Sequence, residues 1–411
     1  MVEGPLNGVR VLELAEDLAG AFAGQIVADQ GAEVIKLERP QGDPLREYSA
    51  YAPGESKLFQ SLNRGKKSVV VDVETEAGRE IIRKLAKRAD VVVTSLSRGT
   101  LESLGVDYEA VRKQNESVVY VELSAFGTKG PWANRVGNDL VMQAFTGLMA
   151  SENKRLLDRA PAAIRSTQTP ARTAGIIAAL GVSTGLFYRK RTGKGQRIET
   201  SQLVTALAVQ AGRTSSNPPA DERARTPAVE RMREARTEHE GFDAMQQARG
   251  MGRVGVGNIF YRAFQSRDGA VFIGALSRPL RARARRALET EFMHRDDPNW
   301  DPTDPETAKH AEEQVRLVEE TFRKYTTQEW EARCDAENVP VGEVVFPEDL
   351  AQSAQAQANH YIIQVEHETA GTQQHVAPIA KFNAFPTPAI EGAPSLGRDT
   401  EAVLKELNDR S

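Results

Sequence analysis

The chain has 411 residues, more than one compact domain of about 250–300 residues usually holds, so its length predicts two domains. Its 57 acidic and 53 basic residues give a net charge of −4, which excludes the basic character typical of nucleic-acid and membrane-surface binders. The single cysteine, Cys334, excludes a disulfide framework, and the sequence shows neither a secretory leader nor an apolar run of about 18 residues, so we expect a cytoplasmic protein.

Hydrophobic runs alternate with helix-like segments over the first 125 residues. Runs rich in β-branched residues predict strands at 9–14, 32–38, 67–73, 89–95 and 118–124. Helices are predicted between them at 19–30, 75–88 and 108–114, with Thr75 as the N-cap of the second. This alternation is typical of an α/β fold with a parallel sheet and helices on its faces.

The rest of the chain is less regular. The pattern predicts a helix at 137–150, capped by Gly137 or Asn138, and another at 169–190 with Pro170 at its first position. The triplet at 217–219 marks a linker before a charged, solvated helix at 221–250. Beyond it we expect a hairpin at 261–275, a loop at 294–307, and helices at 312–325 and 327–338.

The opening strand, turn and helix have the order of a dinucleotide-binding unit. Their turn, Ala15–Gly20, holds one glycine and the acids Glu16 and Asp17, so the G-x-G-x-x-G pattern is missing. The residues therefore favour a scaffold without a nicotinamide site over an oxidoreductase. No acid, histidine or cysteine cluster has metal-ligand spacing, and all six histidines follow residue 238.

Other polar features have both a functional and an ordinary interpretation. The basic stretches 36–40 and 63–67 suit a phosphorylated ligand, or are solvated strand ends. The arginines of 278–286 fit a solvated helix face better than a nucleic-acid site. The loop 253–258, with Gly255 and Gly257, either folds over a substrate or is simply flexible. Asp139 suits the first turn of a helix, where its charge complements the dipole.

The order of these segments resembles the family III CoA-transferases, which include formyl-CoA transferase, carnitine CoA-transferase and α-methylacyl-CoA racemase. The likeness runs almost from end to end. It rests on GVRVLEL, LAGAFAGQIVADQGAEVIKLERPQGD, LGVDYEAVRKQN, GTKGPWANRVGNDLVMQAFTGLMA, RKRTGKGQ and SLGRDTEAVLKEL. Each motif is weak by itself, but together they are specific.

The resemblance implies a large Rossmann-like domain whose parallel sheet is built from both chain ends, at 1–215 and 340–411. It also implies a smaller inserted α+β domain at 222–339 and an interlocked dimer with active sites between subunits. No cofactor is bound permanently; coenzyme A and acyl-CoA are substrates, and no metal is implied.

The family's transferases use one aspartate in a stretch like G-D-x-x-x-G, whose carboxylate attacks the acyl-CoA thioester. Here the matching stretch is Pro170–Gly175, and Ala171 occupies the nucleophile position. The racemases add a G-H-D motif, which reads Gly137-Asn138-Asp139. The resemblance therefore implies no catalytic residue on this chain, with Asp139 as the fallback.

The CoA contacts carried over from the family fall on residues after the predicted strands. They are Arg39, Val71, Val73, Ser95, Leu96 and Arg98. Glu74 stands where the family often has lysine, and Glu16 where a basic or neutral residue is usual. A carboxylate near CoA phosphates is unfavourable, so this site departs from the family pattern.

Three hypotheses account for a family framework without its nucleophile. In the first, the chain is the non-catalytic subunit of a heteromeric CoA-transferase, and a homologous partner supplies the aspartate. It is then similar to the nucleophile-free subunit of benzylsuccinate CoA-transferase, which acts in anaerobic toluene breakdown. In the second, Asp139 or Asp158 takes over in an active homodimer. In the third, the chain is a CoA-binding or structural module.

Overall fold

The computed structural model describes residues 4–152, 154–222, 225–239, 241–249, 258–292, 296, 305–385 and 390–409. The chain folds into two units, Met1–Pro218 with Asn359–Ser411, and Pro219–Ala358. It returns to the larger unit at residue 359, not at residue 340 as expected. The reason is that β9 (Val341–Glu343) pairs with β8 (Ala270–Gly274), which holds this stretch in the smaller unit.

The larger unit contains a six-stranded parallel sheet in the order β3-β2-β1-β4-β5-β6, the order of doubly wound α/β folds. Its strands are β1 (Arg10–Leu14), β2 (Glu33–Glu38), β3 (Lys67–Val70), β4 (Val91–Thr94), β5 (Val119–Ser124) and β6 (Gln196–Ser201). The α/β prediction is therefore confirmed. The expectation that both chain ends supply strands to this sheet is wrong, because the described C-terminal residues form a separate hairpin, β10 (Ile362–His367) and β11 (Gly371–Val376).

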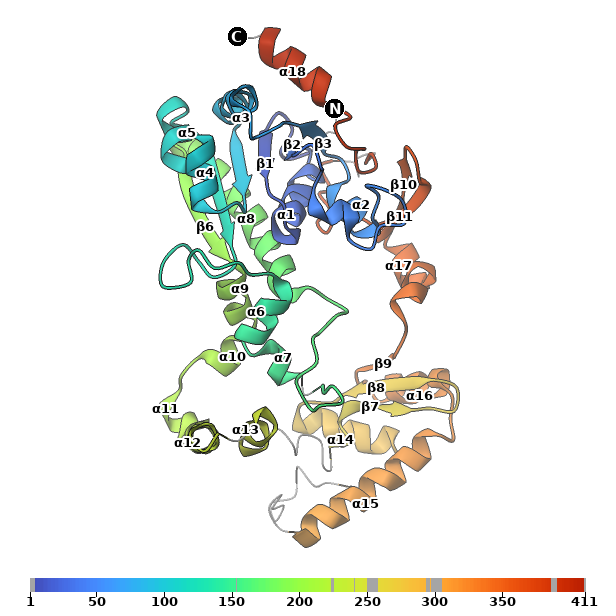
Figure 1. The fold of residues 1–411 in the computed structure, drawn as a ribbon. Helices are drawn as coiled ribbons and strands as arrows, with labels where there is room; N and C mark the ends of the chain where they lie inside the picture. Colours follow the sequence, from blue (N-terminus) through green and yellow to red (C-terminus); the bar gives the residue numbers. More distant parts are fainter. Residues whose placement is uncertain are drawn as a thin grey trace. The chain divides into compact units, whose positions relative to one another are not determined.

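Helices cover both faces of the parallel sheet (Figure 1). One face packs on α1 (Leu18–Ala28) and α8 (Thr169–Thr192). The other packs on α3 (Glu76–Arg88), α4 (Arg98–Leu104), α5 (Tyr108–Gln114) and α18 (Thr400–Asp409). Alternate side chains of a strand point to opposite faces, so Val91 and Val93 join the first layer and Val92 the second.

Helix α8 is long and apolar enough, by length and composition, to cross a membrane. In the larger unit it lies instead against α1 and the sheet, with residues such as Ala174, Ala178 and Val182 fully buried. A Cβ at Gly175 would meet the Ala19 carbonyl oxygen at 2.7 Å, so a residue without a side chain permits this close approach. We therefore assign α8 to the core.

The segment predicted as one helix at 137–150 forms two, α6 (Asp139–Phe145) and α7 (Leu148–Ser151). The break falls at Gly147, whose φ of +79° is left-handed. Asn138 caps α6 as predicted, because its side chain accepts a hydrogen bond from the Val141 backbone N–H. The other helices of the unit are η1 (Pro44–Glu47), α2 (Lys57–Asn63), α9 (Gln202–Val209) and α10 (Ala211–Thr214). Helix α11 (Pro218–Asp221) lies at the expected linker, where the chain passes into the smaller unit.

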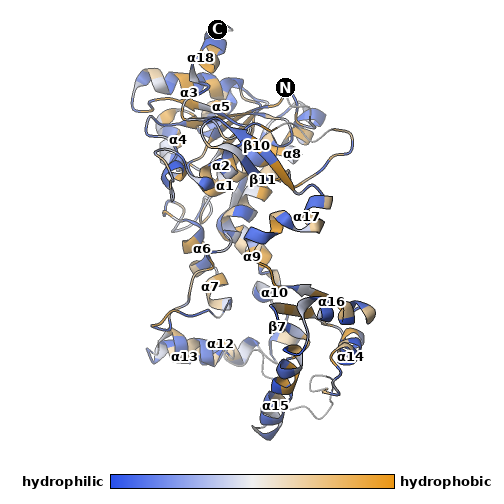
Figure 2. Ribbon diagram, turned by 90° about the vertical axis from the view of Figure 1, so that its right-hand side faces the viewer, coloured by the Kyte–Doolittle hydropathy of each residue, from blue (hydrophilic) through white to orange (hydrophobic). Residues whose placement is uncertain are grey.

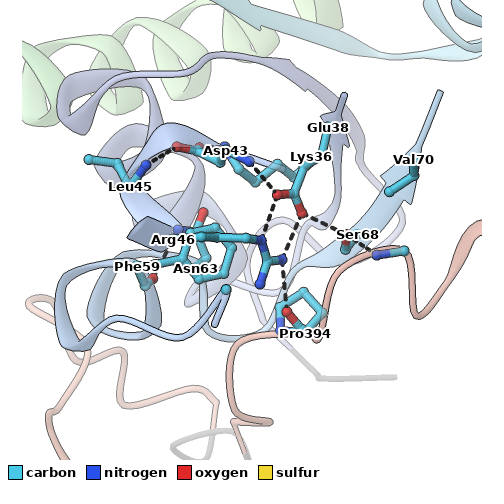
Figure 3. A network of polar contacts seen from close by, with 12 residues as sticks. Lys36, Glu38, Asp43, Leu45, Arg46, Phe59, Asn63, Ser68, Val70 and Pro394 are labelled. Atoms are coloured by element: carbon cyan, nitrogen blue, oxygen red, sulfur yellow. Dashed lines mark hydrogen bonds and ion pairs between the residues drawn. The ribbon is translucent and has the colours of Figure 1, made fainter. Parts of the chain in front are cut away.

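Buried charges tie β2 to the C-terminal segment (Figure 3). The Arg46 guanidinium donates to both carboxylate oxygens of Glu38 at 2.8 Å and to the Pro394 carbonyl at 3.0 Å. The Ser68 hydroxyl donates to Glu38 and accepts from the Gly397 N–H. Because Arg46, Glu38 and Ser68 are buried, the network holds the segment near residue 394 against β2 and β3.

The same segment occupies the outer edge of β3. The Ser68 and Val70 N–H groups donate to the side chains of Asp399 and Thr400 at 2.9 and 3.0 Å. The Asp399 N–H donates in turn to the Ser68 carbonyl. The C-terminal segment thus supplies the partners that an edge strand otherwise lacks.

The smaller unit combines an antiparallel sheet with helices. The predicted hairpin is present as β7 (Tyr261–Gln265) and β8, and β9 adds the third strand. Its helices are α12 (Arg225–Thr237), α13 (Phe242–Ala248), α14 (Arg278–Ala287), α15 (Pro305–Phe322), α16 (Thr327–Ala336), η4 (Pro347–Gln352) and α17 (Ala354–Ala358). Helix α15 begins inside the stretch predicted as a loop, at Pro305, a residue favoured in a first helical turn.

Candidate functional site

The residues carried over as CoA contacts follow parallel strands and therefore gather at the carboxyl edge of the sheet. Arg39 follows β2, and Val71 and Val73 follow β3. Ser95 and Leu96 follow β4 on the other side of β1. The strand order reverses between β1 and β4, and ligands of open α/β sheets bind in the crevice at such a point.

A cleft of about 410 Å³ opens at this edge, beside the ends of β4 and β5. Ser95, Leu96 and Arg98 line it, whereas Arg39, Val71 and Val73 do not. The Arg39 guanidinium is instead 2.7 Å from the Glu16 carboxylate. The structure thus brings half of the predicted contacts into one cleft.

Two cations in the cleft were missed by sequence reasoning. Lys129 and Arg135 lie in the loop after β5, and neither forms an ion pair with a residue that the structure describes. The Arg135 guanidinium stacks over the Trp132 ring at 4.4 Å. By contrast, Arg98 is 2.8 Å from Glu102. Unpaired cations of this kind suit phosphate groups, and their position in the loop that follows a parallel strand was the available signal.

The residue expected at the nucleophile position lies in the packed interior of the larger unit. Ala171, in the first turn of α8, is 1% exposed and belongs to the core layer shared with α1. Its methyl group carries no reactive atom. Neither Ala171 nor Asp139 lines the cleft at the carboxyl edge.

The Asp139 carboxylate caps the start of α8 from outside that helix. One oxygen accepts from the Ala171 N–H at 3.0 Å, and the other accepts from the Gln143 amide at 2.7 Å. Gln143 is itself fixed by Ile164, whose N–H donates to its oxygen and whose carbonyl accepts from its nitrogen. Burial raises the pKa of Asp139, and the two hydrogen bonds and the charge of Arg172 oppose this increase. The carboxylate therefore has a structural task beside Ala171, where it holds the first turn of α8.

The remaining candidates lie elsewhere. Gly255 and Gly257 fall outside the described residues. Asp158 is exposed and accepts from the Ala160 N–H. Of the late histidines, His367 and His375 return to the larger unit in the β10–β11 hairpin, next to α2. Within the described part of the chain, no group of acids, histidines and cysteines is arranged to hold a metal ion.

Comparison with known proteins agrees with this architecture. The family model described as CoA-transferase family III matches residues 6–400. Succinyl-CoA:glutarate CoA-transferase of Mus musculus is 28% identical over 405 residues, covering 98% of this chain and 86% of the mouse protein. Succinate–glutarate CoA-transferase of Agrobacterium fabrum is also 28% identical, over 98% and 96% of the two chains.

Among solved structures, a CAIB/BAIF family protein from Brucella suis superposes with a TM-score of 0.75. It is 25% identical in sequence, and the match covers 98% of this chain and 100% of the Brucella chain. The six-stranded sheet, the small antiparallel sheets and the near-complete family match lead to one conclusion: the chain belongs to CoA-transferase family III.

Proposed function

We propose that the chain is the non-catalytic subunit of a heteromeric CoA-transferase that moves CoA between carboxylic acids. A homologous partner supplies the nucleophilic aspartate, and this chain completes the partner's site across the interface. The observation that carries the proposal is Ala171, a buried methyl group in the first turn of α8. A hydrocarbon cannot form the acyl anhydride or the aspartyl thioester on which this transfer depends.

The geometry of Asp139 disfavours an active homodimer that uses this acid instead. Both of its oxygens accept hydrogen bonds, and it is 9% exposed. A nucleophile must approach the reacting carbon to about 3–3.5 Å, and displacement of a reactive group by about an ångström costs roughly 100-fold in rate. Asp139 is therefore better explained as a cap that positions α8.

An exposed apolar surface supports the partner subunit. Large side chains of α8 and its neighbours α6 and α9 are about two-fifths or more exposed: Ile176, Ile177, Leu180, Phe187, Tyr188, Leu140, Val141, Phe145, Val204 and Val209. Figure 2 shows hydrophobic stretches on α6 and α9. Apolar surface gathered on packed helices is characteristic of protein interfaces. The family's interlocked dimer, here formed with the homologous chain, would cover it.

Lys129 and Arg135 line the cleft at the carboxyl edge of the sheet. They favour the hypothesis that this chain still binds CoA over the hypothesis that it is a purely structural module. For the acids, the relatives that transfer CoA between succinate and glutarate favour a dicarboxylate pair. The assignment of benzylsuccinate as acceptor, in the cytoplasm during anaerobic toluene breakdown, rests on the family resemblance alone.

The test is CoA transfer by the purified chain, alone and mixed with a neighbouring family member that carries aspartate in G-D-x-x-x-G. With succinyl-CoA and either glutarate or benzylsuccinate, we expect product thioester only from the mixture. Intact-mass analysis after incubation with acyl-CoA should show an adduct on the partner and none on this chain. Turnover or an acyl adduct on the chain by itself would refute the proposal.

A further inference from the structure

A second cavity, of about 840 Å³, lies between α1, α2 and β11 in the larger unit. Phe22, Leu58, Val376 and Ile379 form its apolar walls. Its polar lining includes four glutamines and the cations Lys57, Arg64 and Arg172, and none of the described lining residues is an aspartate or glutamate. The cavity therefore combines hydrocarbon walls with an excess of positive charge.

The two arginines of the cavity differ in their partners: Arg64 forms an ion pair, and Arg172 forms none with a described residue. Arg64 is 2.7 Å from the Asp29 carboxylate and donates to the Val376 carbonyl. Arg172 is half-buried over the Phe22 ring, 4.7 Å from its centroid. Its side chain forms neither an ion pair nor a hydrogen bond with any residue that the structure describes. Burial lowers the pKa of Arg172, and the Asp139 carboxylate offsets only part of this effect.

We propose that this cavity binds an organic acid, with a carboxylate on the Arg172 guanidinium and the hydrocarbon body against Phe22 and Leu58. A guanidinium presents paired N–H donors that match the two oxygens of a carboxylate. Inorganic phosphate offers the same charge but no hydrocarbon to contact the apolar walls. The proposal rests on the proposed function, since Arg172 directly follows Ala171 and an acid held here lies beside the position where the family transfers CoA.

His375 does not supply further charge to the cavity at neutral pH. Burial lowers its pKa to about 4, and the positive charge of Arg64 acts in the same direction. Its ring nitrogen Nε2 lies 2.9 Å from the Gln373 amide oxygen. Lys57 is exposed and forms no ion pair with a described residue, so it adds a weaker, solvated charge at the cavity. Arg172 is thus the principal anchor.

Isothermal titration calorimetry of the purified full chain tests the site without requiring turnover. We expect glutarate to bind with a Kd of about 1 mM or tighter, the neutral glutaramide not to bind, and inorganic phosphate to bind more weakly than glutarate. Arg172→Gln should weaken glutarate binding roughly 10- to 100-fold, the size of one charge-assisted hydrogen-bonded contact. Arg172→Lys should restore part of the loss, because it returns the charge without the planar fork.

Arg191→Gln is the matched control. Arg191 lies on the same helix over the Phe187 ring, 5.7 Å from its centroid, and outside the cavity. This variant should bind glutarate like the unmodified chain. Equal losses in both variants, no binding of glutarate, or tighter binding of phosphate would each overturn the site. Intact glutarate binding without CoA transfer by the mixture of this chain with the aspartate-carrying family member would instead count against the proposed function alone.

Discussion

Asp139→Asn tests whether the buried carboxylate beside Ala171 is a structural cap. The Asn oxygen can still accept from the Ala171 N–H, but its NH₂ group then faces the NH₂ group of Gln143. Gln143 cannot turn over without breaking both of its hydrogen bonds to Ile164. Two buried donors in opposition cost about 1–3 kcal/mol. The substitution also removes a buried charge, and this offsets part of the cost of the opposed donors. We therefore expect a net loss of about 1–2 kcal/mol in the free energy of unfolding.

Urea unfolding at neutral pH measures the loss, with tryptophan fluorescence as the signal, since Trp132 packs 4.5 Å from the Phe145 ring of α6. Asp158→Asn is the matched control, because Asp158 is exposed and bonds only locally; it should change stability by less than about 0.5 kcal/mol. The reasoning is refuted if Asp139→Asn leaves stability unchanged. It is refuted more directly if the isolated chain transfers CoA and Asp139→Asn abolishes that transfer.

Two further predictions concern buried charge. Arg46→Leu removes the ion-pair partner of the buried Glu38 carboxylate, which keeps the Ser68 hydroxyl and the Asp43 N–H as donors. The free energy of unfolding should fall by about 3–5 kcal/mol in urea titrations, and a loss below about 1 kcal/mol would contradict this reasoning. Burial lowers the pKa of His375 to about 4. Between pH 6.5 and 4 this histidine is therefore protonated in the unfolded chain but neutral in the folded chain. Stability should therefore fall by roughly 1–2 kcal/mol as pH drops from 6.5 towards 4, and His375→Gln should remove this part of the pH dependence; an unchanged dependence would contradict the assignment.

The sheet and its helices were predictable because their signals are local. Hydrophobic runs, the Thr75 cap and Pro170 each act within a few residues, and the structure places strands and helices within a few positions of the expected ones. The expected strand at 67–73 ends at Val70, since the edge of the sheet stops there and residues 71–73 turn away. Local patterns identify elements more reliably than their ends.

The cavity beside Arg172 was beyond reach of the same reasoning. Its walls come from positions as distant along the chain as Phe22 and Val376, and no periodicity links them. The family resemblance predicted that the C-terminal segment returns to the larger unit as strands of the parallel sheet. The segment does return, but its side chains hydrogen-bond to the edge of β3 and its described residues add no strand there. Tertiary neighbours of this kind are set by packing over long sequence separations.

The closure of β3 by Asp399 and Thr400 also bears on synthesis of the protein. A ribosome that has completed the six strands by Ser201 must still add the whole second unit before these two residues emerge. At about 5–20 residues per second, the nascent sheet waits roughly 10–40 s with an open flank. During that interval a second nascent chain can pair with the exposed edge of β3. The yield of folded protein in cells should therefore depend on chaperone capacity and on growth temperature, and not only on the stability of the finished fold.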